Sequence, residues 1–215
     1  MQDKLTIASV YHSLESKRLL ELNFDLVKKL NPGNDFEWIV ADNTPAGFAE
    51  KIDSKKFLVL PGIKMPENIP KWLRGSFQHS WAVNDSVKHI QTRFALFLDI
   101  DFYILKQNWI AETLDYMKQN SLWILGAPWH PQHTIKPRYF PAIHCLFVDF
   151  SKIDKNSLDF SPEYNFWESA RKQPWMEKFV KRIMKISPSL GERLQIGQSQ
   201  DTAYKIYRRY YFNQQ

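Results

Sequence analysis

The segment of the sequence that decides the fold is Arg93-Phe94-Ala95-Leu96-Phe97-Leu98-Asp99-Ile100-Asp101-Phe102. Its five consecutive apolar residues, 94–98, are typical of a strand buried on both faces of a parallel sheet. Two carboxylates follow, two positions apart. Because residues i and i+2 of extended backbone point the same way, Asp99 and Asp101 are predicted to face one small volume. That volume lies at the carboxyl end of the strand, where open α/β sheets place ligands.

The pair Asp99 and Asp101 predicts a metal site. Two like charges this close are costly unless something neutralises them. Carboxylate oxygens suit Mg²⁺ or Mn²⁺, and such a cation bridges carboxylates to phosphate oxygens. The alternative is that the two residues only turn the chain after the strand, since the D-x-D tripeptide is common. The apolar run and the strand-end position favour the metal site.

Short β-type runs alternate with helical patterns along most of the chain. The β-type runs are 5–11, 36–41, 57–60, 94–98, 123–125 and 143–150. The helical patterns are 16–30, 75–90 and a helix that Asn108 caps and that ends near Lys118. This alternation predicts a three-layer α/β/α fold with a mostly parallel central sheet. We expect a single domain over residues 1–215.

Composition narrows the function classes only in part. Lys and Arg outnumber Asp and Glu by 29 to 23, a net charge of +6 that suits a nucleotide diphosphate, a nucleic acid or an acidic membrane face. No nucleic-acid motif accompanies the dispersed basic residues. Cys145 is the single cysteine, which excludes an intramolecular disulfide framework and a cysteine-based zinc cluster. Its apolar surroundings indicate a small buried side chain.

Two features bear on location. The first residues do not form a secretory signal, and no window approaches the roughly 18 apolar residues of a membrane helix, so a cytoplasmic protein is expected. The stretch 175–186 is amphipathic and basic. We expect it to pack on the domain core with its Lys residues outward. The alternative is peripheral contact with the inner face of the membrane, near a lipid-linked acceptor.

The segment 93–102 resembles the DXD motif of GT-A glycosyltransferases of the family 2-like type, and other segments follow in that family's order. Residues 36–43 resemble its second strand, whose terminal Asp contacts the nucleotide base; Asp42 takes that position. Residues 74–84 resemble the Gly-containing loop and helix before the DXD strand. Gln198-Ser199-Gln200-Asp201-Thr202 resembles a later acidic motif, whose Asp is the general base of inverting members.

This resemblance implies a transferase that moves a sugar from a UDP-, dTDP- or GDP-sugar to a hydroxyl of a glycan or lipid-linked acceptor, with inversion. Residues up to about 105 would form the nucleotide-binding half, and those from about 106 the acceptor-side half. Asp99 and Asp101 would hold Mn²⁺ or Mg²⁺, and Asp201 would be catalytic. The implied nucleotide-sugar-binding residues are Val10, Tyr11, Asp42, Arg74, Gly75, Gln78, His79, Asp99, Ile100, Asp101 and His144.

Several of these residues have a plain structural alternative. Asp42 either forms an Asx-turn before Pro45 or accepts the imide N–H of a pyrimidine base. Gly75 either makes a turn or lets an anion approach the backbone, and Arg74 beside it is either a surface charge or a phosphate contact. His79 and His144 are packing residues or ligands. Asp201 is an N-cap or the general base.

Other functions remain as rival hypotheses. A nucleotidyltransferase of related fold would need a Gly-rich N-terminal phosphate loop with a basic residue, which 5–22 lacks. A non-catalytic protein that binds a nucleotide-sugar or a nucleic acid is the other alternative.

Overall fold

The structure is a computed structural model that describes residues 4–44, 52–53, 55–62, 74–129, 141–162, 175, 178–179, 182, 185–187 and 202–210. In this part of the chain a six-stranded sheet has the strand order β3-β2-β1-β4-β6-β5. Its strands are β1 (Leu5–Tyr11), β2 (Phe36–Asp42), β3 (Leu58–Leu60), β4 (Phe94–Leu98), β5 (Ile124–Pro128) and β6 (Pro141–Asp149). The first four in the order run parallel, whereas β6 is antiparallel to both of its neighbours. The expected α/β class with a mostly parallel sheet is confirmed.

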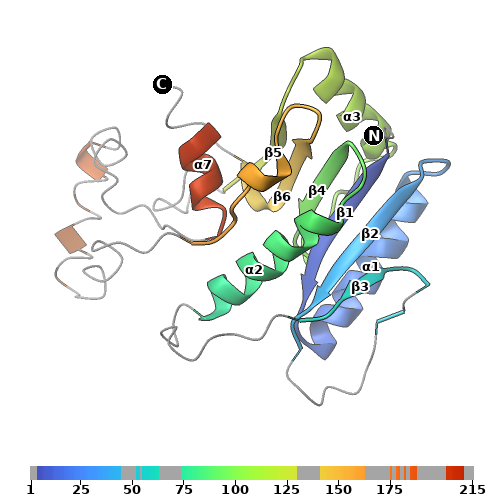
Figure 1. Ribbon diagram of the computed structural model, residues 1–215, viewed down its shortest axis with the longest axis horizontal. Coiled ribbons are helices and arrows are strands. Elements are labelled where there is room, and N and C mark those ends of the chain that lie inside the picture. The colour runs from blue at the N-terminus through green and yellow to red at the C-terminus, as the bar shows by residue number, and fades with distance from the viewer. Residues whose placement is uncertain are drawn as a thin grey trace.

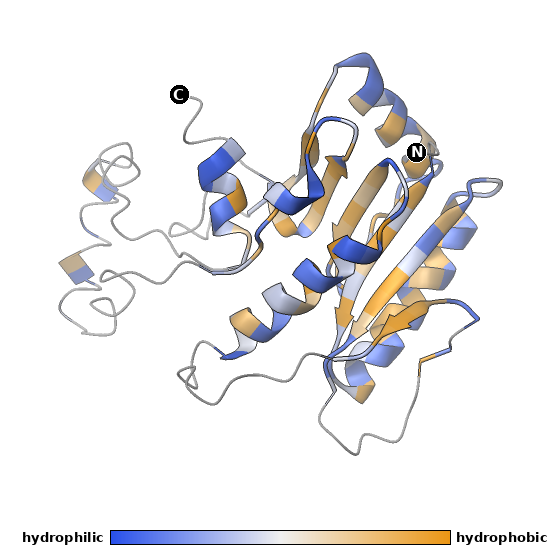
Figure 2. Ribbon diagram, viewed as in Figure 1, coloured by the Kyte–Doolittle hydropathy of each residue, from blue (hydrophilic) through white to orange (hydrophobic). Residues whose placement is uncertain are grey.

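Helices cover both faces of the sheet (Figure 1). The helices are α1 (Leu14–Leu30), α2 (Arg74–His89), α3 (Trp109–Gln119) and α7 (Tyr204–Tyr210), with a short 3₁₀ helix η1 (Lys155–Ser157). Alternate residues of β1 face opposite sides: Ile7 packs in one core with Leu20 of α1, and Ala8 in the other with Val83 of α2. Figure 2 shows the apolar strands between these two helical layers. The predicted three layers are therefore present.

The start of α3 agrees with the sequence prediction in position but not in the capping contact. Asn108 occupies the N-cap position, as predicted, but it has a φ of 54° and makes no side-chain capping bond. The cap comes from Asn31 at the end of α1, whose Oδ1 accepts from the backbone N of Ile110 at 2.9 Å. The Nδ2 of the same amide donates to Val27 O at 2.8 Å. One buried amide thus joins the end of α1 to the beginning of α3.

Cys145 lies on β6 and is buried, as expected. Burial raises the pKa of its thiol to about 11, against a backbone hydrogen bond from Ala127 that lowers it. The thiol is therefore neutral at physiological pH and reacts poorly.

In the segment 175–186, which the structure describes at 175, 178–179, 182 and 185–186, the apolar side chains that are described do not fit the expectation of a helix packed on the core. Its described apolar side chains, Trp175, Phe179 and Ile186, are 67%, 52% and 74% exposed. That expectation is therefore wrong for these three residues. Within the described residues, no helix has the length and apolar character needed to cross a membrane.

A buried ion pair joins Arg93, the residue before β4, to Asp149 at the end of β6. Asp149 is fully buried and receives hydrogen bonds from Arg93 Nε at 3.1 Å and Arg93 Nη2 at 2.9 Å. Ser151 adds bonds from its backbone N at 2.9 Å and its hydroxyl at 2.6 Å. Burial alone would raise the pKa of Asp149, but these bonds outweigh it, so the pKa lies below the usual value.

We predict that Arg93→Met lowers the free energy of unfolding by about 3–5 kcal/mol at neutral pH, because it leaves a buried carboxylate without its cation. Since the folded-state pKa of Asp149 is depressed, its stabilising contribution is present above the unfolded pKa of about 4 and is lost as pH falls through the folded pKa. The difference between wild type and variant should therefore shrink below about pH 4. Urea denaturation over a pH series measures both effects.

The control is Lys88→Met, which breaks the exposed Lys88–Asp85 pair of 2.9 Å on α2. It should change stability by less than about 1 kcal/mol. An equal loss in both variants would contradict the role given to Arg93.

Candidate functional site

The two carboxylates follow β4 on a turn. The backbone N of Phe102 donates to Asp99 O at 3.0 Å, which closes a four-residue turn over 99–102. The extended backbone predicted for Asp99 and Asp101 is therefore wrong, because the strand ends at Leu98. Asp99 N donates to His144 O at 3.1 Å and so continues the β4–β6 pairing for one more residue. Both carboxylates nevertheless line one pocket.

A buried amide of α1 holds this turn. Asn23 is fully buried, and its Nδ2 lies 2.9 Å from Phe102 O and 3.4 Å from Ile100 O. These two carbonyls lie within the acidic turn, so the contact fixes the backbone that carries Asp99 and Asp101. Sequence reasoning missed Asn23. A polar residue at a position of α1 that faces the core is the one indication that could have revealed it.

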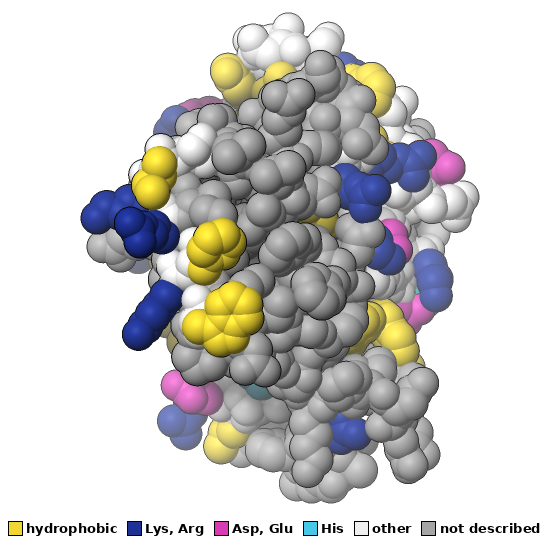
Figure 3. All heavy atoms as spheres, turned by 90° about the vertical axis from the view of Figure 1, so that its left-hand side faces the viewer, with side chains coloured by type: hydrophobic (Ala, Val, Ile, Leu, Met, Phe, Trp, Pro, Cys, Tyr) yellow, Lys and Arg dark blue, Asp and Glu magenta, His cyan; other side chains and the backbone are white. Residues whose placement is uncertain are grey.

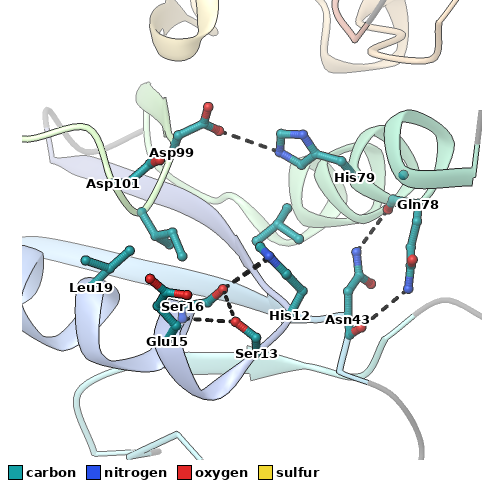
Figure 4. A pocket seen from close by; sticks show the side chains of 13 residues that line it. His12, Ser13, Glu15, Ser16, Leu19, Asn43, Gln78, His79, Asp99 and Asp101 are labelled. Carbon is teal, nitrogen blue, oxygen red and sulfur yellow. Dashed lines mark hydrogen bonds and ion pairs between the residues drawn. The ribbon is translucent and has the colours of Figure 1, made fainter.

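The pocket encloses about 560 Å³ at the carboxyl ends of β1, β2 and β4. This size is ordinary for a small-molecule site. Seven predicted site residues line it: Val10, Gly75, Gln78, His79, Asp99, Ile100 and Asp101. Six further residues that sequence reasoning did not single out complete the lining: His12, Ser13, Glu15, Ser16, Leu19 and Asn43. Figure 4 shows their arrangement.

The first turn of α1 forms one wall of the pocket. Ser13 is the N-cap, and its Oγ accepts from Ser16 N at 3.2 Å. Ser16 Oγ lies 2.9 Å from Ser13 Oγ and 3.3 Å from the His12 ring. A Ser just before a helical pattern is a recognised capping residue. The sequence pattern missed this wall because it started the helix at Ser16, two residues late.

The carboxyl end of β2 and the N-terminal turns of α2 form a second wall of the pocket. Asn43 Nδ2 donates to Gln78 O at 3.0 Å, and Gln78 Nε2 lies 3.4 Å from Asn43 O. Asn43 N also donates to Tyr11 O at 2.7 Å. These bonds place the end of β2 beside the first turns of α2. The first turns of both α1 and α2, with their positive dipole ends, therefore border the same pocket.

Asp99 is the most perturbed carboxylate in the pocket. Its Oδ1 lies 3.7 Å from His79 Nε2, and Figure 4 shows the two side chains pointing toward each other. Burial raises the pKa of Asp99 and the charge of Asp101 adds to this, while His79 and His144 act in the opposite direction. The net shift is upward. A cation that enters the pocket would therefore stabilise the charged form of this carboxylate.

Asp99 and Asp101, which line the same pocket, could hold a cation that takes its other ligands from a substrate. Within the described residues, no group of three or more His, Cys, Asp or Glu side chains could hold a metal ion. Two carboxylates with phosphate oxygens and water are nevertheless a usual Mg²⁺ arrangement. Asp99 and Asp101 would be the protein ligands.

Four predicted site residues, Tyr11, Asp42, Arg74 and His144, do not line the pocket. Asp42 Oδ1 accepts from Thr44 N at 2.9 Å, which is the Asx-turn alternative. The Tyr11 side chain is fully buried in the core beneath the sheet's helical layer and not in the pocket lining. Arg74 is the first residue of α2, next to Gly75.

His144 packs between two aromatic rings. Its ring centroid lies 5.0 Å from that of Phe102 and 4.9 Å from that of Trp129.

Asp201 lies outside the described residues, so its predicted catalytic role stays a prediction. The next residue is described: Thr202 Oγ1 donates to Ser76 O at 3.5 Å, in the first turn of α2.

No protein-family model and no curated protein matches the chain. Solved structures that it resembles include residues 1–349 of TarS from S. aureus, with 15% identity, a TM-score of 0.48 and coverage of 73% of this chain and 50% of that one. A second is the mannosyltransferase PcManGT from Pyrobaculum calidifontis in complex with GDP-Man and Mn²⁺, with 10% identity, a TM-score of 0.45 and coverage of 69% and 45%. A third is the galactosyltransferase LgtC with donor and acceptor sugar analogues, with 14% identity, a TM-score of 0.43 and coverage of 68% and 58%. This chain matches between 20% and 58% of the length of such structures.

We predict that Asn23→Leu lowers the free energy of unfolding by about 1–3 kcal/mol, because it leaves buried carbonyls of the turn unpaired at nearly constant side-chain volume. The turn should also become more mobile, which hydrogen exchange at residues 99–102 measures. The control is Asn120→Ala, which removes an exposed bond of 2.9 Å to Tyr116 O at the end of α3. Unchanged exchange of the turn in Asn23→Leu would show that Asn23 does not hold it.

Proposed function

We propose that this chain is a metal-dependent glycosyltransferase that moves a sugar from a nucleotide-diphosphate donor to an acceptor hydroxyl. The observation that carries the proposal is the pocket that Asp99 and Asp101 line together with residues from the first turns of α1 and α2. This combination suits a ligand that is anionic and arrives with a divalent cation. The order of motifs in the sequence, which resembles that of GT-A enzymes, adds the reaction type.

The diphosphate is the part of the donor that this pocket suits best. Helix N-termini bind phosphate through free backbone N–H groups and the positive end of the dipole. Gly75 lies in the first turn of α2 and lines the pocket, so a phosphate can approach its backbone closely. A cation held by Asp99 and Asp101 would neutralise the negative charge of the departing diphosphate.

The proposed position of the nucleotide base is at the ends of β1 and β2, and it is supported by Val10 and Asn43, which line the pocket there. The family pattern assigns base contact to Asp42. The geometry favours its neighbour Asn43, because Asn43 lines the pocket whereas Asp42 does not and forms the turn contact with Thr44 N. We therefore propose that the end of β2 contacts the base through Asn43, with UDP, dTDP and GDP as the candidate nucleotides.

Asp201 is the proposed general base, on the strength of the family pattern. Support comes from its neighbour Thr202, which contacts Ser76 one residue after the pocket-lining Gly75. In a single displacement, the acceptor oxygen would form a bond to the anomeric carbon and give its proton to Asp201. The bond from that carbon to the diphosphate would break, and the diphosphate would leave with the electron pair, so that the configuration inverts. The proposed acceptor is a glycan or a lipid-linked acceptor.

The proposal is tested by titrating the protein with UDP, dTDP and GDP, with and without MnCl₂, in a calorimeter. We expect at least one nucleotide to bind with Mn²⁺ dependence. Asp99→Asn and Asp101→Asn should each weaken that binding by at least about tenfold, because each removes one of the two protein carboxylates.

The matched control is Asp115→Asn, which removes an exposed carboxylate of α3 that pairs with Lys118 at 2.8 Å. It should bind like wild type. Mn²⁺-independent binding of every nucleotide, or an equal effect of all three substitutions, would defeat the metal assignment. Transfer from a labelled nucleotide-sugar then tests turnover.

A second prediction concerns Gly75→Ala. An added Cβ at Gly75 would meet no atom within 4 Å, so the fold should be unaffected and the helix stabilised by up to about 1 kcal/mol. If a phosphate lies against this backbone, the same methyl group should weaken nucleotide-diphosphate binding by roughly threefold or more. Thermal melting and the calorimetric titration separate the two effects. Normal binding by a well-folded variant would place the diphosphate elsewhere.

A further inference from the structure

The segment 175–186 has the composition of an amphipathic helix that lies on a surface. It contains four basic residues and one acidic residue, Glu177, for a net charge of +3. At about 100° per residue, its apolar residues fall on one half of a helix and its basic residues on the other. The apolar residues are Trp175, Met176, Phe179, Val180, Ile183, Met184 and Ile186, and the basic ones are Lys178, Lys181, Arg182 and Lys185.

The residues of this segment that the structure describes lie at the boundary between the apolar half and the basic half, and they are exposed to solvent. The described residues of the segment have helical backbone, and all six are exposed: Trp175, Lys178, Phe179, Arg182, Lys185 and Ile186. Their helical spacing places the three apolar side chains beside the three basic ones. The segment lies on the left of Figure 1, the side that faces the viewer in Figure 3, where hydrophobic and basic side chains lie next to one another.

We propose that this segment binds the surface of an anionic lipid bilayer. Trp175, Phe179 and Ile186 would enter the headgroup region, and Lys178, Arg182 and Lys185 would contact lipid phosphates. Aromatic and aliphatic side chains flanked by Lys and Arg are the pattern that holds a helix in the membrane interface. The basic residues add an attraction of their own to an acidic lipid surface.

Other occupants fit this surface less well. A second copy of the chain would bring like charges together, because each copy presents the same three cations. A nucleic acid would pair with the cations but would leave Trp175, Phe179 and Ile186 largely in water, since phosphates cover only the basic edge. A bilayer satisfies both halves at once. The inference does not rest on the proposed transferase activity.

The test is flotation of the full chain with vesicles of phosphatidylcholine alone and of phosphatidylcholine mixed with phosphatidylglycerol. We expect binding to the mixed vesicles to be at least about tenfold tighter, and to weaken as salt is raised. The triple variant Lys178→Glu/Arg182→Glu/Lys185→Glu should lose this difference. Phe179→Ser should weaken binding while keeping the preference for anionic lipid.

The matched control is Lys28→Glu/Lys29→Glu/Lys55→Glu, which makes the same change of net charge at exposed positions elsewhere. It should bind like wild type. Equal loss in the control would show that net charge alone drives binding and would overturn the proposal. So would equal binding to both vesicles.

Insertion of the segment into the bilayer can also be measured directly. This second measurement remains informative if a variant floats poorly for reasons unrelated to lipid binding. Phe179→Cys can be labelled with an environment-sensitive fluorophore, since the native Cys145 is buried. Its emission should shift to the blue on mixed vesicles and stay unchanged with phosphatidylcholine alone or with duplex DNA. A shift with DNA, or one on raising protein concentration without lipid, would favour a nucleic acid or a second copy and overturn the proposal.

Discussion

The geometry of the candidate site depends on one buried amide. Asn23 of α1 donates to the carbonyls of Ile100 and Phe102, and thereby holds the turn that directs Asp99 and Asp101 into the pocket. Backbone carbonyls at this depth need a donor, because an unpaired one costs about 1–3 kcal/mol. The helix therefore does more than cover the sheet. Its middle fixes the acidic turn, while its first turn forms the opposite wall of the same pocket.

Much of the fold was predictable because its strands are strongly apolar and clearly bounded. The limits of β1 and β4 agree with the prediction, since Leu5–Tyr11 and Phe94–Leu98 are each followed directly by a polar residue, His12 and Asp99. The turn after β4 was predicted incorrectly. Its conformation depends on Asn23, 79 residues from Phe102 in the sequence, and a spacing rule based on local backbone contains no information about that contact. The cap of α3 was missed for the same reason, because Asn31 supplies it from another helix.

The part of the candidate pocket that the sequence could predict is the part that the strand topology alone brings together. Parallel strands end at one edge, so Val10 and Asp99 meet there although they lie far apart in the sequence. Two alternatives for Asp42 were open, and the structure shows the Asx-turn contact with Thr44 N. Sequence could not decide between them, because both require the same carboxylate at the end of the same strand. The pocket wall formed by Ser13 was overlooked because the apolar spacing typical of a helix becomes recognisable in the sequence only after Ser13.

The amide of Asn31 has a consequence for how the molecule opens. Its Nδ2 is bound to Val27 of its own helix and its Oδ1 accepts from Ile110 in α3, so α1 and α3 cannot separate without breaking the bond to Ile110 that joins them. Both helices also bury side chains in the same apolar core. The layer behind the sheet should consequently behave as one cooperative unit, with slow amide exchange at a common rate in two helices distant in sequence. The pocket wall and the acidic turn would then be lost together, in a single subglobal opening event.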